Sequence, residues 1–357
     1  MFPRPKRLRK ISQESKENRI RFDTNDYLGL SKNFEQYRPK STISTWGASG
    51  SRLLGGNSEI SCKLEYEIAK RLGTSAALLF SSGYLANVGI LSSILTRNDF
   101  VFADKLCHAS IIDGIRLSGA RLIRFKHNDS KHLRSLLMAH RHLAKEALII
   151  TESLFSMDGD TPDLKEIIAL KKEFECVLYV DDAHAIGVYD KDGYGLCKQY
   201  MPDIDIIVGG FGKALGSIGG YVGCSTEIKE FLVSSSRTFI YTTALPAPVL
   251  EWNYHIWTML PSLEMERDKL HSLIGWFNQT FLPSKEIYSQ IVPIICGSDK
   301  STIELSNTLE KAGFSVPAIR PPSVPEKTSR LRLSLCAYHT KEELNGVMSI
   351  VQKYVSL

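Results

Sequence analysis

Short apolar runs alternate with helical patterns between about residue 65 and residue 225. Each run ends in polar residues or glycine, and the segments between them have the spacing of amphipathic helices. The runs lie at 76–80, 100–103, 122–125, 147–151, 177–180 and 206–208. Near-continuous apolar strands separated by helices are typical of a mostly parallel sheet that is buried on both faces. The pattern therefore predicts an α/β fold whose ligands bind at the carboxyl ends of the strands, where the polar residues follow.

The pattern changes after residue 223. Two prolines, Pro246 and Pro248, open a long helical stretch that runs toward Leu282, and an α+β pattern follows it. Strands are expected at 291–295 and 331–335, with a proline-rich loop between them. We therefore expect an N-terminal arm and first segment (1–40), a large domain with a mostly parallel central sheet flanked by helices (41–250), and a smaller α+β C-terminal domain (251–357).

Composition narrows the class of protein. The 357 residues are 43% hydrophobic and 23% charged, which is ordinary globular usage and excludes a disordered or fibrous chain. No apolar run approaches the ~20 residues of a membrane span, so no membrane association is expected. The charged first ten residues have no apolar core behind them, so no secretory signal is expected either.

The seven cysteines form no C-x-x-C pair and are odd in number. A secreted disulfide framework or a zinc ribbon would need close, even spacing. Reduced and mostly buried thiols are therefore expected, and with them a cytoplasmic location.

The net charge of +5 is concentrated in the first 21 residues, which carry a local +6 and leave about −1 for the rest. Such a run is usually a solvated arm, and the alternative is an electrostatic contact with an anionic substrate or partner. Nucleic acid is the least supported partner, because the body of the chain has no basic surplus and no binding motif. We expect none.

Asp181 and His184 stand three residues apart at the end of a predicted strand. The pair could be a buried salt-bridged turn, a functional acid and imidazole, or two metal ligands. No third ligand stands nearby, so no metal is expected.

Lys213 lies in the run Gly209-Gly210-Phe211-Gly212-Lys213-Ala214, just past an apolar strand. A lysine flanked by glycines at this place could bind phosphate or form a Schiff base. The P-loop pattern is not met, because Ala214 follows the lysine.

In a third segment, 80–87, a strand passes through a small-residue turn into a helix, whose first N–H groups can bind an anion. The three features together match what pyridoxal phosphate requires: a carboxylate on the ring nitrogen, a lysine on the aldehyde and a helix N-terminus on the phosphate.

From about residue 25 to residue 339 the chain resembles the α-oxoamine synthase family of fold-type-I pyridoxal-phosphate enzymes. The motifs that carry the resemblance are Asn25-Asp26-Tyr27-Leu28-Gly29-Leu30-Ser31, Gly50-Ser51-Arg52, Ser82-Gly83-Tyr84, His108-Ala109-Ser110, Phe155-Ser156-Met157-Asp158-Gly159-Asp160, Asp181-Asp182-Ala183-His184, Phe211-Gly212-Lys213-Ala214, Tyr241-Thr242-Thr243-Ala244-Leu245-Pro246 and Arg320-Pro321-Pro322-Ser323-Val324-Pro325. The resemblance implies a fold-type-I transferase with pyridoxal 5′-phosphate as cofactor.

The resemblance also implies roles for single residues. Lys213 would hold the cofactor and move the Cα proton of the substrate, Asp181 would pair with the ring nitrogen, and His108 would stack on the ring. The remaining implied cofactor contacts are His184 and Ser156 at the phenolic oxygen, and Gly83 and Tyr84 at the phosphate. Thr242 or Thr243 would reach the phosphate of a neighbouring subunit, which implies a homodimer with a shared active site.

Asn25, Ser323 and Arg332 would contact substrate, with Arg332 holding the amino-acid carboxylate. His108 could instead be a core histidine, Ser156 a turn hydroxyl and Arg332 a surface strand charge.

Several positions depart from the pattern of the family. Gly210 stands where a threonine is usual, Ser61 where a histidine is usual, and Ala185 and Lys327 where glycines are usual. The arginine that the family uses near its start cannot be placed, and Arg7 or Arg9 is a guess. These departures leave the cofactor chemistry intact and weaken the assignment of the acyl substrate.

The resemblance implies a decarboxylative condensation of L-alanine with the thioester of an acyl-CoA or acyl carrier protein. The nearest alternative is a sister synthase that uses glycine or another acyl chain. A non-catalytic cofactor-binding module of a transcription regulator is a third possibility, but the basic stretch of 21 residues at the N-terminus is too short for a DNA-binding domain. A catalytically dead homologue is a fourth.

Overall fold

The computed structural model describes residues 19–40, 45–283 and 289–355. Most of the basic arm, with the guessed Arg7 and Arg9, therefore lies outside the described residues. Two members of the arm are described, and both are paired. Arg19 forms an ion pair with Glu310, and Nε of Arg21 lies 2.9 Å from Oδ1 of Asp23.

The chain divides into two compact units. The large unit comprises residues 24–292 and 334–339, and the small unit comprises residues 1–23, 293–333 and 340–357. These bounds differ from the small domain expected at 251–357, because the helices at 247–259 and 264–281 group with the large unit.

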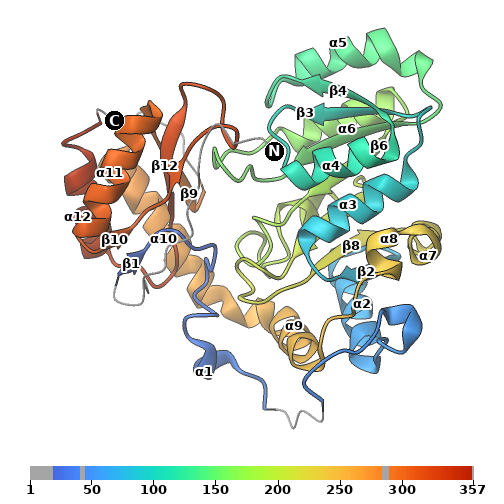
Figure 1. Ribbon diagram of the computed structural model, residues 1–357, viewed down its shortest axis with the longest axis horizontal. Coiled ribbons are helices and arrows are strands. Elements are labelled where there is room, and N and C mark those ends of the chain that lie inside the picture. The colour runs from blue at the N-terminus through green and yellow to red at the C-terminus, as the bar shows by residue number, and fades with distance from the viewer. Residues whose placement is uncertain (1–18, 41–44, 284–288, 356–357) are drawn as a thin grey trace, which may run out of the picture. The chain divides into compact units, whose positions relative to one another are not determined.

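In the described residues, the large unit is built on a seven-stranded sheet in the order β2-β8-β7-β6-β5-β3-β4 (Figure 1). Its strands are β2 (Ala76–Phe80), β3 (Phe100–Asp104), β4 (Arg121–Phe125), β5 (Ala147–Glu152), β6 (Val177–Asp181), β7 (Ile206–Gly210) and β8 (Gly220–Cys224). Only β8 runs against its neighbours. The predicted mostly parallel sheet and its six predicted strands are confirmed.

Helices cover the sheet, as its apolar strands require. They are α2 (Glu59–Leu72), α3 (Gly83–Ile94), α4 (Ala109–Ser118), α5 (Ser130–His140), α6 (Leu164–Glu173), α7 (Thr226–Ser235) and α8 (Arg237–Ile240). α3 and α4 pack side by side on one face, as Figure 1 shows, and their apolar side chains form a buried core with the strands.

The helical stretch after Pro246 is two helices rather than one. α9 (Ala247–Met259) is separated from α10 (Glu264–Phe281) by a short 3₁₀ turn at residues 260–263. Pro261 lies in this turn, and a proline cannot continue the hydrogen bonding of an α-helix interior. α9 packs against α2, which ties the stretch to the large unit.

The described part of the small unit contains short strands and two helices. In its described part, β11 (Ala318–Ile319), β12 (Ser329–Ser334) and β9 (Ile291–Gly297) form one sheet in that order. β1 (Ile20–Arg21) pairs in parallel with β10 (Phe314–Ser315) in a second sheet. The helices are α11 (Asp299–Lys311) and α12 (Lys341–Val351). The two strands predicted here are confirmed as β9 and β12.

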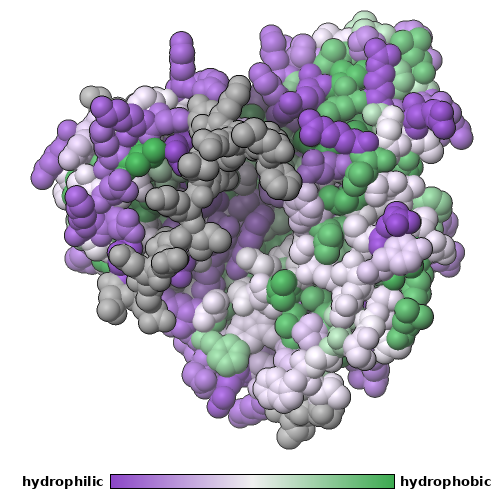
Figure 2. Space-filling model, viewed as in Figure 1, coloured by the Kyte–Doolittle hydropathy of each residue, from purple (hydrophilic) through white to green (hydrophobic). Residues whose placement is uncertain are grey.

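Several large apolar side chains of the large unit remain exposed. Leu54 is 81% exposed, Trp46 78% and Tyr241 71%. In Figure 2, green and white atoms predominate over the part of this unit that carries α2 and α8. Exposed apolar surface of this kind is typical of a protein–protein contact.

No helix in the described ranges is long and apolar enough to cross a membrane. The seven cysteines are free thiols, and five of them are buried, as expected from their spacing.

Candidate active site

The carboxyl ends of the parallel strands carry most of the predicted site residues. β6 ends at Asp181, β3 leads into α4 through His108, and β7 leads to Lys213. The carboxyl ends of parallel strands share one edge of a sheet. The charges of Asp181 and Lys213 both act on the imidazole of His108, which shows that the sheet brings the three side chains together.

The carboxylate of Asp181 is held by two donors. Oδ1 accepts the backbone N–H of Ala183 at 3.0 Å, and Oδ2 accepts Nδ2 of Asn87 at 2.8 Å. The residue is only 9% exposed. Hydrogen bonds from fixed donors orient a buried carboxylate and offset the cost of burying its charge. Asp181 can therefore act as a fixed negative charge beside a protonated ring nitrogen.

Its neighbour Asp182 faces the interior instead. Oδ2 of Asp182 accepts the backbone N–H of Cys197 at 3.4 Å, and the residue is fully buried. Burial raises the pKa of Asp182 to about 7, against hydrogen bonds that lower it. Of the two adjacent carboxylates, Asp182 belongs to the packing of the unit and Asp181 to the site.

His184 is held by a chain of polar contacts from the N-terminal segment. Its Nδ1 lies 2.8 Å from the phenol oxygen of Tyr27, and that phenol donates to Oδ1 of Asn25 at 3.0 Å. The backbone carbonyl of His184 accepts Nε2 of Gln290 at 2.8 Å. Asn25 therefore stands at the end of a chain that orients the His184 ring.

His108 is the N-cap of α4, and its ring lies at the surface of the large unit. This position excludes the alternative of a core histidine. The backbone N–H of His108 donates to Oε1 of Glu152 at 2.6 Å. Its Nδ1 lies 2.7 Å from Oγ of Ser110 and accepts the backbone N–H of Ser110 at 3.3 Å.

The surroundings of His108 favour the neutral imidazole. Partial burial lowers the pKa of His108, and the charge of Lys213 lowers it further, against the charges of Asp181 and Asp113. An uncharged ring is suited to stacking on an aromatic cofactor.

Lys213 stands in a tight turn after β7. The backbone N–H of Gly216 donates to the carbonyl of Lys213 at 2.9 Å, and Gly216 has a φ of +61°. A Cβ on Gly216 would lie 2.8 Å from the backbone nitrogen of Ser31. Glycine is thus required here by both backbone conformation and space.

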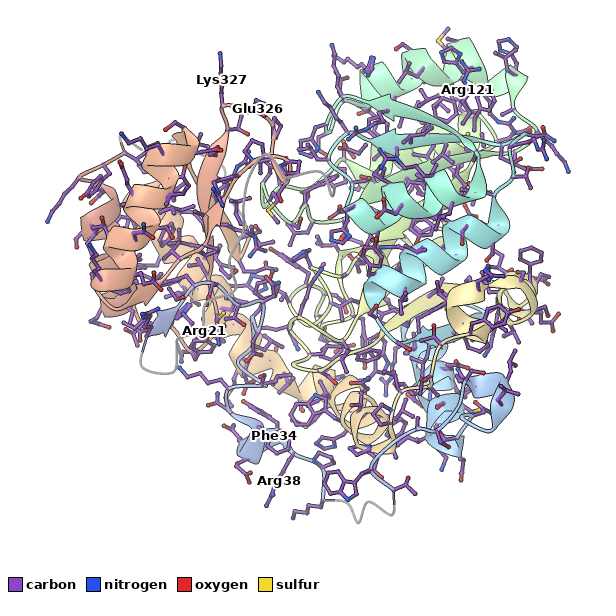
Figure 3. The ribbon with its side chains drawn as sticks, viewed as in Figure 1. Arg21, Phe34, Arg38, Arg121, Glu326 and Lys327 are labelled. Carbon is purple, nitrogen blue, oxygen red and sulfur yellow. The ribbon has the colours of Figure 1, made fainter. Side chains whose placement is uncertain are left out.

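Helix α9 fixes the same turn from another side. Nε1 of Trp252 donates to the carbonyl of Leu215 at 2.9 Å, and Nδ2 of Asn253 donates to the carbonyl of Ile218 at 3.0 Å. Phe34, labelled in Figure 3, stacks on Trp252 with ring centroids 5.1 Å apart. The backbone around Lys213 is therefore held rigidly.

The N-terminus of α3 forms an anion-binding cradle. Oγ of Ser82 caps the helix by accepting the backbone N–H of Leu85 at 3.2 Å. The N–H groups of Gly83 and Tyr84 stand in the first turn, where no intrahelical acceptor exists. A Cβ built on Gly83 would meet nothing within 4 Å, so there is open space beside it. The donors and the space fit a phosphate group.

Gly210 faces this cradle. It pairs with Gly220 across β7 and β8, so side chains at the two positions would project from the same face. A Cβ on Gly220 would lie 2.6 Å from the backbone nitrogen of Gly83. A hydroxyl at position 210 would therefore project on the side of the sheet where α3 begins. Position 210 itself is open, because the nearest atom to an added Cβ is the carbonyl oxygen of Gly219 at 3.6 Å.

Ser156 lies half-buried in a turn after β5. His127 holds the turn in place through both of its ring nitrogens. Nδ1 of His127 lies 2.9 Å from Oδ1 of Asp104, and Nε2 lies 2.9 Å from Oδ2 of Asp160. The His127 ring also packs edge-on against Phe155 at 4.5 Å. The alternative role of Ser156, a turn hydroxyl, agrees with this position and does not conflict with a cofactor contact.

Thr242 and Thr243 line a small pocket beside the start of α3. Oγ of Ser81 donates to the carbonyl of Thr243 at 3.1 Å. The backbone of this segment is thus held by its own chain, and the predicted reach of Thr242 or Thr243 into a neighbouring subunit stays a prediction.

Ser323 and Arg332 belong to the small unit. Arg332 lies in β12 and is only 5% exposed, so it is not the surface charge considered as an alternative. Ser323 is exposed in the loop before β12. Their predicted contact with substrate remains a proposal.

Lys327 lies in the same loop with a φ of +65°, the conformation that glycine adopts most easily. This agrees with the glycine that the family usually has there. In Figure 3 the side chain of Lys327 extends away from the ribbon.

Four residues of the site have no role predicted from the sequence: Asn87, Tyr27, Ser110 and Glu152. Glu152 is 3% exposed, and burial together with the charge of Asp181 raises its pKa to about 8. A signal was present for Asn87, which is a polar residue within an otherwise apolar stretch of helix. Tyr27 and Ser110 stood inside recognised motifs, but nothing in the sequence indicated their partners.

Within the described ranges, no group of three or more His, Cys, Asp or Glu side chains could hold a metal ion. The site instead offers a fixed carboxylate, a neutral imidazole, a lysine and a phosphate cradle. This set of groups fits pyridoxal phosphate.

The fold and the site define a pyridoxal-phosphate-dependent enzyme of fold type I, and the chain belongs to the aminotransferase class I and II family, whose model matches residues 17–351. Within this class it is similar to the α-oxoamine synthases, in particular to 8-amino-7-oxononanoate synthases. The enzyme of Chlorobaculum parvum that bears this name is 40% identical over an alignment of 356 positions, and the alignment covers 93% of this chain and 88% of that protein.

Solved structures show the same relationship. The 8-amino-7-oxononanoate synthase of Francisella tularensis has a TM-score of 0.79 at 30% identity, covering 94% of this chain and 98% of that one. Serine palmitoyltransferase of S. paucimobilis, solved with a bound pyridoxal-phosphate–myriocin aldimine, has a TM-score of 0.84 at 29% identity and covers 94% and 87%. The predicted family, fold and cofactor are thereby confirmed.

Proposed function

We propose that this enzyme condenses L-alanine with a pimeloyl thioester, of coenzyme A or of a carrier protein, to give 8-amino-7-oxononanoate for biotin synthesis. The Cα of alanine bonds to the thioester carbonyl carbon as the C–S bond breaks and the thiol leaves. The alanine carboxyl group leaves as CO2, and a proton takes its place on Cα. The names of the relatives support this choice of substrates.

The observation that carries the proposal is the convergence of Asp181, His108 and Lys213 at one edge of the sheet. When bound, pyridoxal phosphate supplies an electron sink for the negative charge that develops on the alanine Cα. Asp181 would keep the ring nitrogen protonated, and the neutral ring of His108 would stack on the cofactor.

The amine of Lys213 would hold the cofactor covalently and, once displaced by alanine, accept the Cα proton at its Nζ. The fixed turn holds the backbone from which the Lys213 side chain projects. The N–H groups of Gly83 and Tyr84 would hold the phosphate. His184 and Ser156 would contact the phenolic oxygen of the cofactor.

Arg332 and Asn25 would bind the amino-acid substrate, with the guanidinium of Arg332 on its carboxylate and Ser323 as a further contact. Arg332 is buried in β12, and a guanidinium can bind a carboxylate through two parallel N–H···O bonds.

We further propose a cytoplasmic homodimer in which Thr242 or Thr243 of one subunit completes the phosphate site of the other. The exposed Tyr241 and Leu54 lie in or near segments that line the pocket beside α3, and burial of such side chains would stabilise a subunit contact.

The structural likeness to serine palmitoyltransferase favours one alternative, a sister synthase with another amino acid and acyl chain. A single assay separates the two. L-Alanine, glycine and L-serine are each combined with thioesters of increasing acyl length, and thiol release is measured. The proposal expects the highest kcat/KM with alanine and the pimeloyl thioester, and a clear preference for serine or glycine would overturn it.

The cofactor chemistry is tested independently. Purified protein loaded with pyridoxal phosphate should absorb visible light, and borohydride reduction should fix the cofactor on Lys213, as peptide mass analysis would show. Lys213→Ala should abolish that attachment. Asp181→Asn should retain the fold and lose most of the condensation activity, because a neutral amide does not stabilise the protonated ring.

A further inference from the structure

Asn87 is a buried amide in the interior of α3. It lies four residues after Gly83, between Ala86 and Val88, and is 2% exposed. A buried amide is costly unless its polar atoms are all hydrogen-bonded. The partners of Asn87 therefore decide whether it only packs or also serves the site.

Both N–H bonds and the carbonyl oxygen of the Asn87 amide are hydrogen-bonded. Nδ2 donates to Oδ2 of Asp181 at 2.8 Å and to Oγ of Ser110 at 2.9 Å. Oδ1 accepts the phenol O–H of Tyr179. Both N–H bonds of the amide thus point at residues that belong to the site or support it.

The direction of the amide is fixed by chemistry. Turning it over would place Oδ1 against the carboxylate of Asp181, where two acceptors would repel each other. Burial raises the pKa of Tyr179, and the charge of Asp181 raises it further, so the phenol stays protonated and donates to Oδ1. The amide therefore presents its N–H bonds to Asp181 and Ser110.

The second N–H bond extends the chain to His108. Because Oγ of Ser110 accepts from Asn87, its own proton is available for Nδ1 of His108, which lies 2.7 Å away. The backbone N–H of Ser110 donates to the same Nδ1. Nδ1 is thus an acceptor, and a neutral His108 carries its proton on Nε2.

We propose that Asn87 is a positioning residue, which fixes the carboxylate of Asp181 toward the ring nitrogen of the cofactor and, through Ser110, fixes the orientation and tautomer of His108. The inference rests on the proposed function. The side chain of Asn87 thereby links Asp181, at the ring nitrogen of the cofactor, to His108, which stacks on the face of the cofactor ring.

The test compares two cofactors. Apoprotein is titrated with pyridoxal phosphate and with its 1-deaza analogue, in which a CH group replaces the ring nitrogen and no proton can be shared with Asp181. Asn87→Ala and Asn87→Leu should weaken binding of pyridoxal phosphate by about ten- to hundredfold, the range expected for hydrogen bonds to a charged group. Binding of the deaza analogue should weaken much less.

Ser110→Ala is the matched control, because it cuts only the branch to His108. It should weaken binding of both cofactors by a similar, smaller factor, since stacking does not depend on the ring nitrogen. If the Asn87 variants do not fold, as judged by circular dichroism of the apoprotein, Tyr179→Phe replaces them. It keeps the amide but removes the donor that fixes its direction, and should produce the same selective loss in weaker form.

An equal loss for both cofactors in the Asn87 or Tyr179 variants, or no loss, would overturn the inference and show that Asn87 only packs. Failure of the unmodified protein to bind pyridoxal phosphate would instead overturn the proposed function. The two outcomes are therefore distinct.

Discussion

The phenol oxygen of Tyr27 lies 2.8 Å from Nδ1 of His184, although 157 residues separate them in the chain. The contact joins the N-terminal segment to the end of β6. It gives one ring nitrogen of His184 a fixed partner, so the other ring nitrogen has a defined direction. In the proposed site that direction is toward the phenolic oxygen of the cofactor.

We expect Tyr27→Phe to lower kcat/KM by about tenfold, because it removes the partner that orients His184. Steady-state kinetics with alanine and the preferred thioester would measure the effect. Tyr194→Phe is the control, since its phenol is also buried and bonds only to the backbone carbonyl of Trp257 among the described contacts. Equal kinetics in the two variants would show that the Tyr27 contact does not serve catalysis.

Gly210→Thr should tighten the binding of pyridoxal phosphate by about tenfold, through one added hydrogen bond to the phosphate. The structure leaves room for the side chain, and no positive φ stands against it. Gly210→Val is the matched control, because valine has nearly the same shape without the hydroxyl. The prediction fails if threonine and valine change the dissociation constant alike.

A Thr242→Ala/Thr243→Ala double variant should bind pyridoxal phosphate more weakly, and cofactor should no longer strengthen its dimer. A ligand that bridges two subunits stabilises their association by linkage. Sedimentation with increasing cofactor measures both effects, and Thr258→Ala, whose hydroxyl bonds within α9, is the control. Unchanged affinity, together with a dimer that does not respond to cofactor, would show that one chain holds the phosphate alone.

His127 should stabilise the fold in a pH-dependent way. Partial burial opposes its protonation, but hydrogen bonds to Asp104 and Asp160 outweigh burial and raise the pKa of His127 to about 10. A group whose pKa is raised on folding contributes its full stability below its unfolded pKa of about 6.5 and loses it as the pH rises through the folded value.

His127→Gln should therefore lower the free energy of unfolding by roughly 2 kcal/mol at pH 6, and by less at pH 9.5. Urea unfolding at both pH values measures the difference, with the exposed His142→Gln as control. A difference that is constant between the two pH values would mean that His127 is not held as a cation.

The sequence by itself determined the sheet, the class of enzyme and the principal groups of the site. Apolar strands of five or six residues with polar ends specify a buried parallel sheet, since any other arrangement would expose them. Asp181 and Lys213 were recognisable because each follows such a strand, and parallel strands end at one edge. The role of His108 was predicted only from the resemblance to the family.

The tertiary structure alone decided how those groups are held. Asn87 and Tyr179 come from different elements, 92 residues apart, and their hydrogen bond depends on how α3 packs on the sheet. The contact between Tyr27 and His184 likewise depends on how distant segments pack together. Local patterns record which residues share a strand or a helix face, whereas partners across packed elements are set by the packing itself. For the same reason, only the folded chain shows that Asp182 faces the interior while Asp181 faces the site.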